Sequence, residues 1–192
     1  MKKLMLFTLI ACLWSCDDSD SNSRDDLCEF NDKIEDLSSR SFKMGFSTWS
    51  FGPDADDQES TYGFIKSNAD IYSEQIDDKI PWGAWINGTA LPEEFTNDIA
   101  QRVARKINGH QLLLSVSLLN TDRSDLLEDY DGSIPEYQEL DDDQIENAYF
   151  DHLDHLIKQF NPNYLVMAME VNDLKLKSEE IWTAYKRLMA NI

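Results

Sequence analysis

Four short apolar runs recur along the chain, and a stretch with helical periodicity follows each of them. The runs span residues 42–47, 69–73, 112–117 and 164–169. Runs that are apolar at nearly every position are typical of strands covered on both faces, as in parallel sheets. The pattern therefore predicts four strands of one parallel sheet.

The segments between these runs have the spacing of amphipathic helices. In the longest ones a large apolar residue recurs every three or four positions, which places the apolar side chains on one helix face. Gly109 follows the end of one such segment, and Ser178 stands where an N-cap is expected for another. Helices are predicted over residues 58–67, 92–108, 141–160 and 178–189.

Strands and helices that alternate in this way form βαβ units. Four units fit either an open doubly wound sheet or half of an eight-stranded barrel. The loop after the first strand, residues 47–53, contains neither a GxGxxG pattern nor a Walker loop, so we expect no nucleotide and no other cofactor. The loops are long and rich in aromatic and acidic residues, as in barrels that bind sugars. The predicted fold class is α/β, with four βα units and parallel strands resembling half of a TIM barrel.

The first sixteen residues have the layout of a bacterial export signal. Lys2 and Lys3 precede an apolar run over residues 4–14 that is too short to span a bilayer. The end of this segment, Leu-Trp-Ser-Cys16, resembles a lipobox, in which the cysteine is lipidated after cleavage. An ordinary secretory signal that happens to contain two cysteines is the alternative.

The acidic stretch DDSDSNSRDD directly follows Cys16 and has no apolar anchor, so it indicates a solvated tether. Acidic residues behind a lipidated cysteine resemble the surface-export signals of Bacteroidota-type lipoproteins. We therefore expect a signal peptide over residues 1–15, a tether over residues 16–41 and a folded part over residues 42–192. The expected location is the outer membrane or cell surface, with membrane contact through the lipid on Cys16.

Charge and cysteine content narrow the range of partners. The chain has 37 acidic and 17 basic residues, a formal net charge of −20, which repels phosphate backbones and makes nucleic acid a poor partner. Cys28 is the one cysteine outside the signal and lipobox, so no internal disulfide framework is expected.

The fourth predicted strand delivers a carboxylate, Glu170, at its carboxyl end. In a barrel this end faces the mouth, where partial desolvation raises the pKa of a carboxyl group and suits it to act as a general acid. The alternative is a glutamate that caps the next helix or pairs with Lys175.

Two tryptophans, Trp82 and Trp85, follow the second predicted strand together with several charged residues. Aromatic rings beside carboxylates suit the apolar faces and hydroxyl groups of sugars. The alternative is that both rings pack under the next helix. The candidate carbohydrate contacts from all four strand ends are Trp49, Glu74, Asp77, Asp78, Trp82, Trp85, Asn120, Asp122, Arg123 and Asn172.

His152 and His155 lie three residues apart on a predicted helix, a spacing that also occurs in metal sites. His152 falls on the apolar stripe of that helix, and the sequence contains no HExxH or paired CxxC pattern. We therefore expect no metal.

Four segments, FSTWSFGPD, TYGFIKSNADIYSEQIDDKIPWGAW, LLLSVSLLNTDR and FNPNYLVMAMEVNDL, resemble the amino-terminal half of a bacterial (β/α)8-barrel glycoside hydrolase. They are most similar to the arabinogalactan endo-β-galactosidase-like members of the retaining clan with catalytic glutamates on strands four and seven. The resemblance implies that Glu170 is the acid/base, although Met169 stands where the clan has asparagine and Asn172 follows two residues later. It also implies that the nucleophile belongs to a strand beyond this sequence.

These features predict a cell-envelope lipoprotein that resembles a glycoside hydrolase and acts on a polysaccharide or oligosaccharide. Because retaining hydrolysis needs a second carboxylate about 5–5.5 Å from the first, we expect this chain to be weakly active or inactive. A half-barrel also has open sheet edges that favour self-association. One alternative is a surface lipoprotein that binds glycans or a protein without catalysis, and another is an open α/β domain unrelated to sugars.

Overall fold

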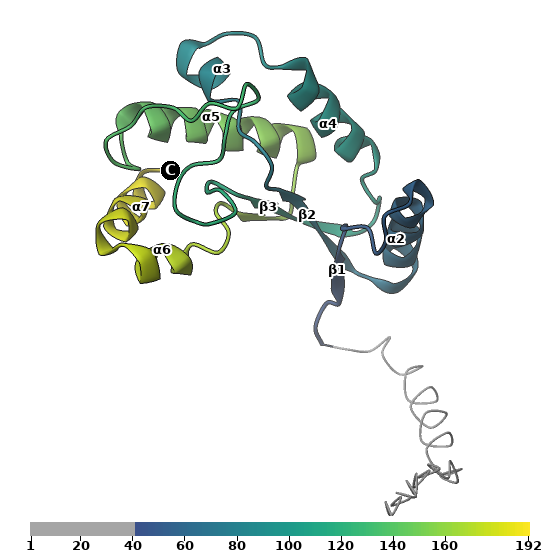
Figure 1. Ribbon diagram of the computed structural model, residues 1–192. Coiled ribbons are helices and arrows are strands. Elements are labelled where there is room, and N and C mark those ends of the chain that lie inside the picture. Colours follow the sequence, from purple (N-terminus) through teal and green to yellow (C-terminus); the bar gives the residue numbers. More distant parts are fainter. Residues whose placement is uncertain (1–40) are drawn as a thin grey trace, which may run out of the picture. The chain divides into compact units, whose positions relative to one another are not determined.

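The computed structural model describes residues 41–192 (Figure 1). The chain divides into two units, Met1–Phe42 and Lys43–Ile192, and every element described here belongs to the second. The predicted signal peptide, the lipidation site Cys16 and almost all of the predicted tether lie outside the described residues. The strands are β1 (Gly45–Ser47), β2 (Ile71–Ile76), β3 (Gln111–Val116) and β4 (Tyr164–Val166). The helices are α2 (Ala55–Asn68), α3 (Trp82–Asn87), α4 (Glu93–Ala104), α5 (Asp143–Phe160), α6 (Asn172–Lys177) and α7 (Glu179–Asn191).

The four strands form one parallel sheet in the order β1-β2-β3-β4. A doubly wound sheet reverses its strand order at a switch point, and this sheet does not. The predicted α/β class with parallel strands is therefore confirmed, and the sequential order is that of a half TIM-barrel arrangement.

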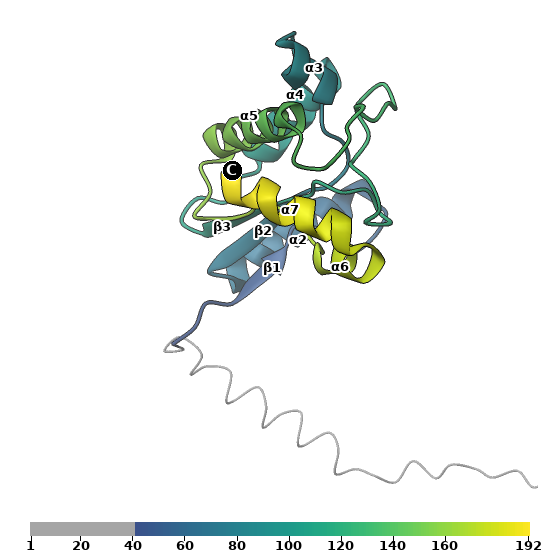
Figure 2. The ribbon, with the colours of Figure 1, turned by 90° about the vertical axis from the view of Figure 1, so that its left-hand side faces the viewer.

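The two faces of the sheet differ in their cover. On β2, Tyr72, Glu74 and Ile76 are buried on the face that the helices cover. In both views α4 and α5 lie on the same side of the sheet (Figures 1 and 2). On the opposite face, Tyr164 and Val166 of β4 are exposed. The sequence pattern predicted cover on both faces, and within the described residues the structure shows it on one.

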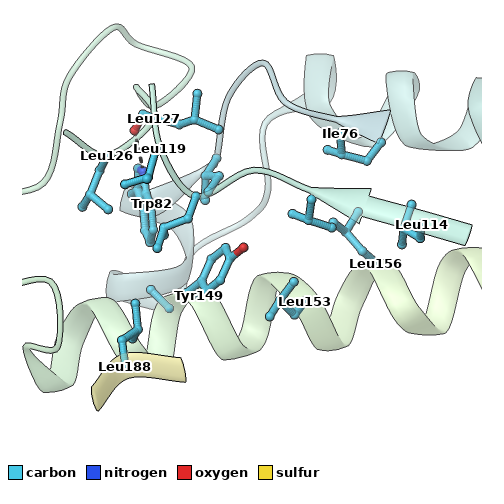
Figure 3. Close-up of a cluster of buried hydrophobic side chains, with 14 of the residues drawn as sticks. Ile76, Trp82, Leu114, Leu119, Leu126, Leu127, Tyr149, Leu153, Leu156 and Leu188 are labelled. Carbon is cyan, nitrogen blue, oxygen red and sulfur yellow. Dashed lines mark hydrogen bonds between the residues drawn. The ribbon is translucent and has the colours of Figure 1, made fainter. Parts of the chain in front are cut away.

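Helix α5 supplies much of the apolar cover of β3. Leu153 and Leu156 point from α5 toward Leu114 of β3 and Ile76 of β2 (Figure 3). All four side chains are buried. Full burial of such a side chain contributes about 1.5–3 kcal/mol to stability. This layer therefore holds β2 and β3 against α5.

Two short helices differ from the predicted loops. Residues 82–87 form α3, which starts at the N-cap Pro81 and ends at Gly88, where φ is +62°. Glycine adopts this left-handed conformation without steric cost, and it is the usual residue there. Residues 172–177 form α6, which directly follows the fourth strand end. Helices of fewer than two turns are too short to show periodicity in the sequence.

The longer helices follow the predictions to within a few residues. The predicted cap Ser178 is confirmed, since its hydroxyl accepts a hydrogen bond from the N–H of Ile181 at 3.3 Å. Among residues 41–192, none of the helices combines the length and apolar character needed to cross a bilayer.

Candidate functional site at the carboxyl ends of the strands

The carboxyl ends of parallel strands lie along one edge of a sheet, so the loops that follow them are neighbours. The structure places most of the larger predicted site residues in three groups, and Asp78, Asn120, Asp122 and Asn172 lie outside them. Trp49, Glu74 and Asp77 surround one cavity. Arg123 and Glu170 form an ion pair across the ends of β3 and β4. The remaining tryptophans lie on α3.

Glu74 forms the floor of the cavity and is only 4% exposed. One carboxylate oxygen accepts hydrogen bonds from the hydroxyls of Thr48, at 2.9 Å, and Tyr62, at 3.0 Å. The other oxygen accepts a hydrogen bond from Arg102 Nη1 at 2.9 Å. Burying a charge is costly unless it is paired and hydrogen-bonded, and Glu74 meets both conditions. It therefore joins the loop after β1 to α2 and α4, and both of its oxygens are already engaged.

This network shifts the ionisation of its members. Burial and the neighbouring Glu74 carboxylate raise the pKa of Tyr62 well above its ordinary value, so the phenol stays a hydrogen-bond donor. The pKa of Arg102 is raised despite its partial burial, because Asp98 and Glu74 favour the charged guanidinium. The floor of the cavity is thus a fixed set of charges and donors.

The cavity above Glu74 has a volume of about 270 Å³, close to the lower end of the range of roughly 300–1,000 Å³ for small-molecule sites. Trp49 stands at its rim with 63% of its surface exposed. Hydrogen-bonding side chains supply most of the lining. The lining residues are Thr48, Trp49, Ser50, Gln58, Tyr62, Glu74, Gln75, Asp77, Asp98, Arg102 and Arg105. An exposed aromatic ring beside a polar cavity offers both an apolar face and hydrogen-bonding partners to a ligand.

Asp77 directly follows β2 and lines the cavity. Its carboxylate accepts a hydrogen bond from Gln75 Nε2 at 2.8 Å. Burial, followed by the charge of Asp78, raises the pKa of Asp77, while Gln75, Arg102 and Arg123 oppose the rise. Asp77 therefore responds to the charges of both arginines.

Arg123 and Glu170 pair through both Nε, at 2.9 Å, and Nη2 of the guanidinium. Arg123 Nη1 also donates to the carbonyl oxygen of Asn120 at 2.6 Å. Both members of the pair adopt left-handed backbone conformations, with φ of +52° and +53°. The other non-glycine residue with positive φ in the described chain is Asn161, the C-cap of α5. Left-handed backbone at larger residues costs about 1–3 kcal/mol and gathers at functional sites.

The surroundings of Glu170 differ from those expected for a general acid. Its side chain is 68% exposed and is held by a guanidinium. The sequence predicted a desolvated carboxyl group at this strand end, and for Glu170 that prediction is wrong. The alternative partner considered from the sequence, Lys175, is replaced by Arg123.

Trp82 does not stand at the mouth. It is 1% exposed, its ring packs near Tyr149 of α5, and its Nε1 donates to the carbonyl oxygen of Leu127 at 2.8 Å (Figure 3). A buried indole has no free face for a ligand, so the predicted stacking role of Trp82 is corrected to a core role. The alternative, packing against a helix, describes it.

Trp85 also packs on α5, between the rings of His152 and His155, with centroid distances of 6.3 and 5.6 Å. Its Nε1 is buried and has no hydrogen-bond partner in the described part of the chain. Trp85 therefore belongs to the layer between α3 and α5 and not to the cavity beside Trp49.

The other predicted contacts are at the surface. Asp78 is exposed, with one carboxylate oxygen 3.9 Å from Arg102 Nη2. Asn120 closes its own turn, accepting a hydrogen bond from the N–H of Ser124 at 3.0 Å. Asp122 is exposed in the same loop, and Asn172 is the exposed first residue of α6.

Within residues 41–192, no group of three or more His, Cys, Asp or Glu side chains is arranged to hold a metal ion. His152 is fully buried among aromatic rings, and both of its ring nitrogens lack a partner in this part of the chain. Burial, with a contribution from His155, lowers the pKa of His152 to about 3. His152 is therefore a neutral core residue at physiological pH.

The sequence analysis missed Tyr62, Arg102 and Arg105, which line the cavity from α2 and α4. One signal was present. Glu74 alternates with the apolar Tyr72 and Ile76 on one face of the strand, so it had to be buried and to need a cation. Nothing in the pattern identified that cation as Arg102, which lies 28 residues away.

Comparisons with protein-family models, with curated proteins and with solved structures found no match to this chain.

Proposed function

We propose that the chain binds a carbohydrate in the cavity beside Trp49 and hydrolyses it weakly or not at all. The observation that supports binding is the exposed indole of Trp49 at the rim of a cavity lined by hydroxyl, amide, carboxylate and guanidinium groups. Sugar rings have apolar C–H faces and a rim of hydroxyls, so one face can stack on the indole while the hydroxyls reach the polar lining.

Weak hydrolysis follows from the state of Glu170. A proton donor to a glycosidic oxygen is a carboxylic acid held in its protonated form by its surroundings. Glu170 is exposed to solvent, and its carboxyl group is engaged by Arg123. Glu170 thus stands at the end of the fourth strand without the desolvated surroundings that support this proposed role.

A glycan array tests the binding proposal. The purified chain is expected to bind one class of oligosaccharide, and Trp49→Ala is expected to lose that binding. Phe150→Ala is the matched control, because Phe150 is an exposed aromatic residue on α5 that does not line the cavity. Absence of any glycan ligand, or equal loss of binding in both variants, would contradict the proposal.

A hydrolysis assay on the bound glycan tests the second part. We expect product release near the background rate and no change in Glu170→Gln. Turnover at a rate typical of enzymes, about 1–10³ per second, that disappears in Glu170→Gln would show that the chain is a working glycosidase.

We also propose that Cys16 holds the protein on the cell envelope through a lipid. The support is the sequence of the first sixteen residues and the acidic stretch after them. Replacement of Cys16 by alanine is expected to release the protein from the membrane fraction. Retention of the variant in that fraction would contradict the anchor.

A further inference from the structure

A second cavity, of about 360 Å³, lies between α2 and the turn that follows α4. Its lining contains three cationic side chains and one carboxylate. The lining residues are Glu59, Tyr62, Gly63, Lys66, Arg105, Lys106, Ile107 and Asn108. Three cations around one cavity are unexpected in a chain with a net charge of −20.

The three cations differ in their hydrogen-bond and ion-pair partners. Lys106 Nζ donates to the carbonyl oxygens of Phe160 and Asn161, at 2.8 and 3.4 Å, at the end of α5. Lys66 and Arg105 form no ion pair with any carboxylate of residues 41–192. Arg102 differs from them, since it contacts three carboxylates, including Glu74.

Helix dipoles account for only part of this positive charge. Lys66 lies in the last turn of α2, and Arg105 is the C-cap of α4. Each helix end contributes roughly half a negative charge. The ends of α2 and α4, the end of α5 that Lys106 contacts and the Glu59 carboxylate therefore offset about two and a half of the three positive charges, so that a net positive charge of about half a unit remains for a ligand.

The second cavity adjoins the first. Tyr62 and Arg105 line both of them. Gly63, on the α2 wall, has no atom within 4 Å of the position that a Cβ would occupy, so this wall is open. A ligand stacked on Trp49 can therefore extend along α2 toward Lys66 and Arg105.

From this charge balance and the adjacency of the two cavities we propose that the second cavity binds the anionic substituent of an acidic carbohydrate, either a carboxylate or a sulfate ester. Guanidinium and ammonium groups hold such oxygens through charge-assisted hydrogen bonds. The inference rests on the proposed function, because it names the class of glycan that the cavity beside Trp49 selects.

The first experiment needs no glycan. Inorganic sulfate and acetate are titrated separately into the ¹⁵N-labelled full chain at constant ionic strength. We expect saturable shifts of amide signals near Lys66 and Arg105, and their loss in the double variant Lys66→Gln/Arg105→Gln. Lys186→Gln, on α7, is the control and should keep them. Absence of saturable shifts with both anions would overturn the inference, whatever the glycan experiments show.

The second experiment compares galactotriose, trigalacturonic acid and a sulfated galactose trisaccharide, together with the acidic and neutral forms of any glycan found on the array. We expect the acidic form to bind about tenfold more tightly. Lys66→Gln, at a residue that lines the second cavity but not the first, should reduce this preference and keep affinity for the neutral form, whereas Trp49→Ala should weaken both. The stronger of the two acidic forms identifies the substituent.

Equal affinity for neutral and acidic forms in the wild type would overturn the inference while leaving the proposed function standing. Loss of both forms in Lys66→Gln, with an unchanged unfolding midpoint, would also count against it, because this cation would then act on the whole ligand.

Discussion

Trp49 and Trp82 follow neighbouring strands and have the same predicted role, yet they lie in opposite environments. Trp82 is 1% exposed and Trp49 is 63% exposed. The difference arises from Leu127, whose carbonyl oxygen accepts the hydrogen bond of the Trp82 indole from 45 residues away. The loop after β1 offers no comparable acceptor. Within the described residues the indole N–H of Trp49 has no hydrogen-bond partner, and its backbone N–H donates to Ser47 Oγ at 3.2 Å.

This comparison shows what decides the role of an aromatic residue at a strand end. An indole becomes core when a distant segment supplies both apolar cover and an acceptor for its N–H. It stays available to a ligand when neither is present. Substitution of Trp82 should therefore lower the free energy of unfolding, whereas substitution of Trp49 should weaken ligand binding and leave that free energy nearly unchanged.

The largest effect is expected for Trp82→Ala. Removing a fully buried large aromatic side chain costs about 3–5 kcal/mol, because the transfer free energy is lost and a cavity remains. The free energy of unfolding, measured by urea denaturation, should fall by this amount. A loss below 1 kcal/mol would show that the ring is not packed as described.

Glu74→Ala should destabilise nearly as much. The change leaves Arg102 without its buried partner and the hydroxyls of Thr48 and Tyr62 without their acceptor, at a cost of roughly 3 kcal/mol. Asp98→Ala is the matched control, because it removes the partly exposed partner of the same arginine and should cost about 0.3–0.5 kcal/mol. Equal losses of unfolding free energy in the two variants would show that the buried Glu74 pairs with Arg102 no more strongly than the partly exposed Asp98 does.

His152→Leu should change the pH dependence of the core. The pKa of His152 is lowered by burial, so the unfolded chain takes up a proton at a higher pH than the folded chain does. Stability is therefore lost as pH falls from about 6.5 toward 3, with a slope of about 1.4 kcal/mol per pH unit from this residue. Urea unfolding at several pH values should show a shallower loss in His152→Leu. His155→Leu is the control. Burial also lowers the pKa of this half-buried residue, but less, so its removal should change the slope less. An unchanged slope in His152→Leu would contradict the burial of His152.

The smallest effect on stability is expected for Trp49→Ala. Substitution of an exposed side chain changes the free energy of unfolding by no more than about 0.5 kcal/mol. Urea denaturation of this variant beside Trp82→Ala measures the contrast directly. A loss of several kcal/mol would mean that Trp49 belongs to the core.

The repeating elements of this chain could be predicted from sequence because they depend on local periodicity. Residues 143–160 form α5 with the apolar face expected from the pattern. The helix α3 could not be predicted in this way, because it has fewer than two turns and is fixed by Pro81 and Gly88. Its misassignment as a loop led directly to the wrong role for Trp82.

The site was only partly accessible to the same reasoning. Parallel strand order brings Trp49 and Asp77 to one cavity, as the sequence suggested. The partner of Glu170 could not be foreseen, since Arg123 reaches it through a loop with left-handed backbone 47 residues away. Neither that turn nor the cations of α4 leaves a local signal.

Isothermal titration with the tightest glycan from the array tests the central claim most directly. The account predicts that Trp49→Ala weakens binding at least about tenfold while the free energy of unfolding stays within about 0.5 kcal/mol of the wild type. Phe150→Ala should bind as the wild type does. An unchanged dissociation constant in Trp49→Ala would contradict the claim that the rim beside Trp49 is the binding surface.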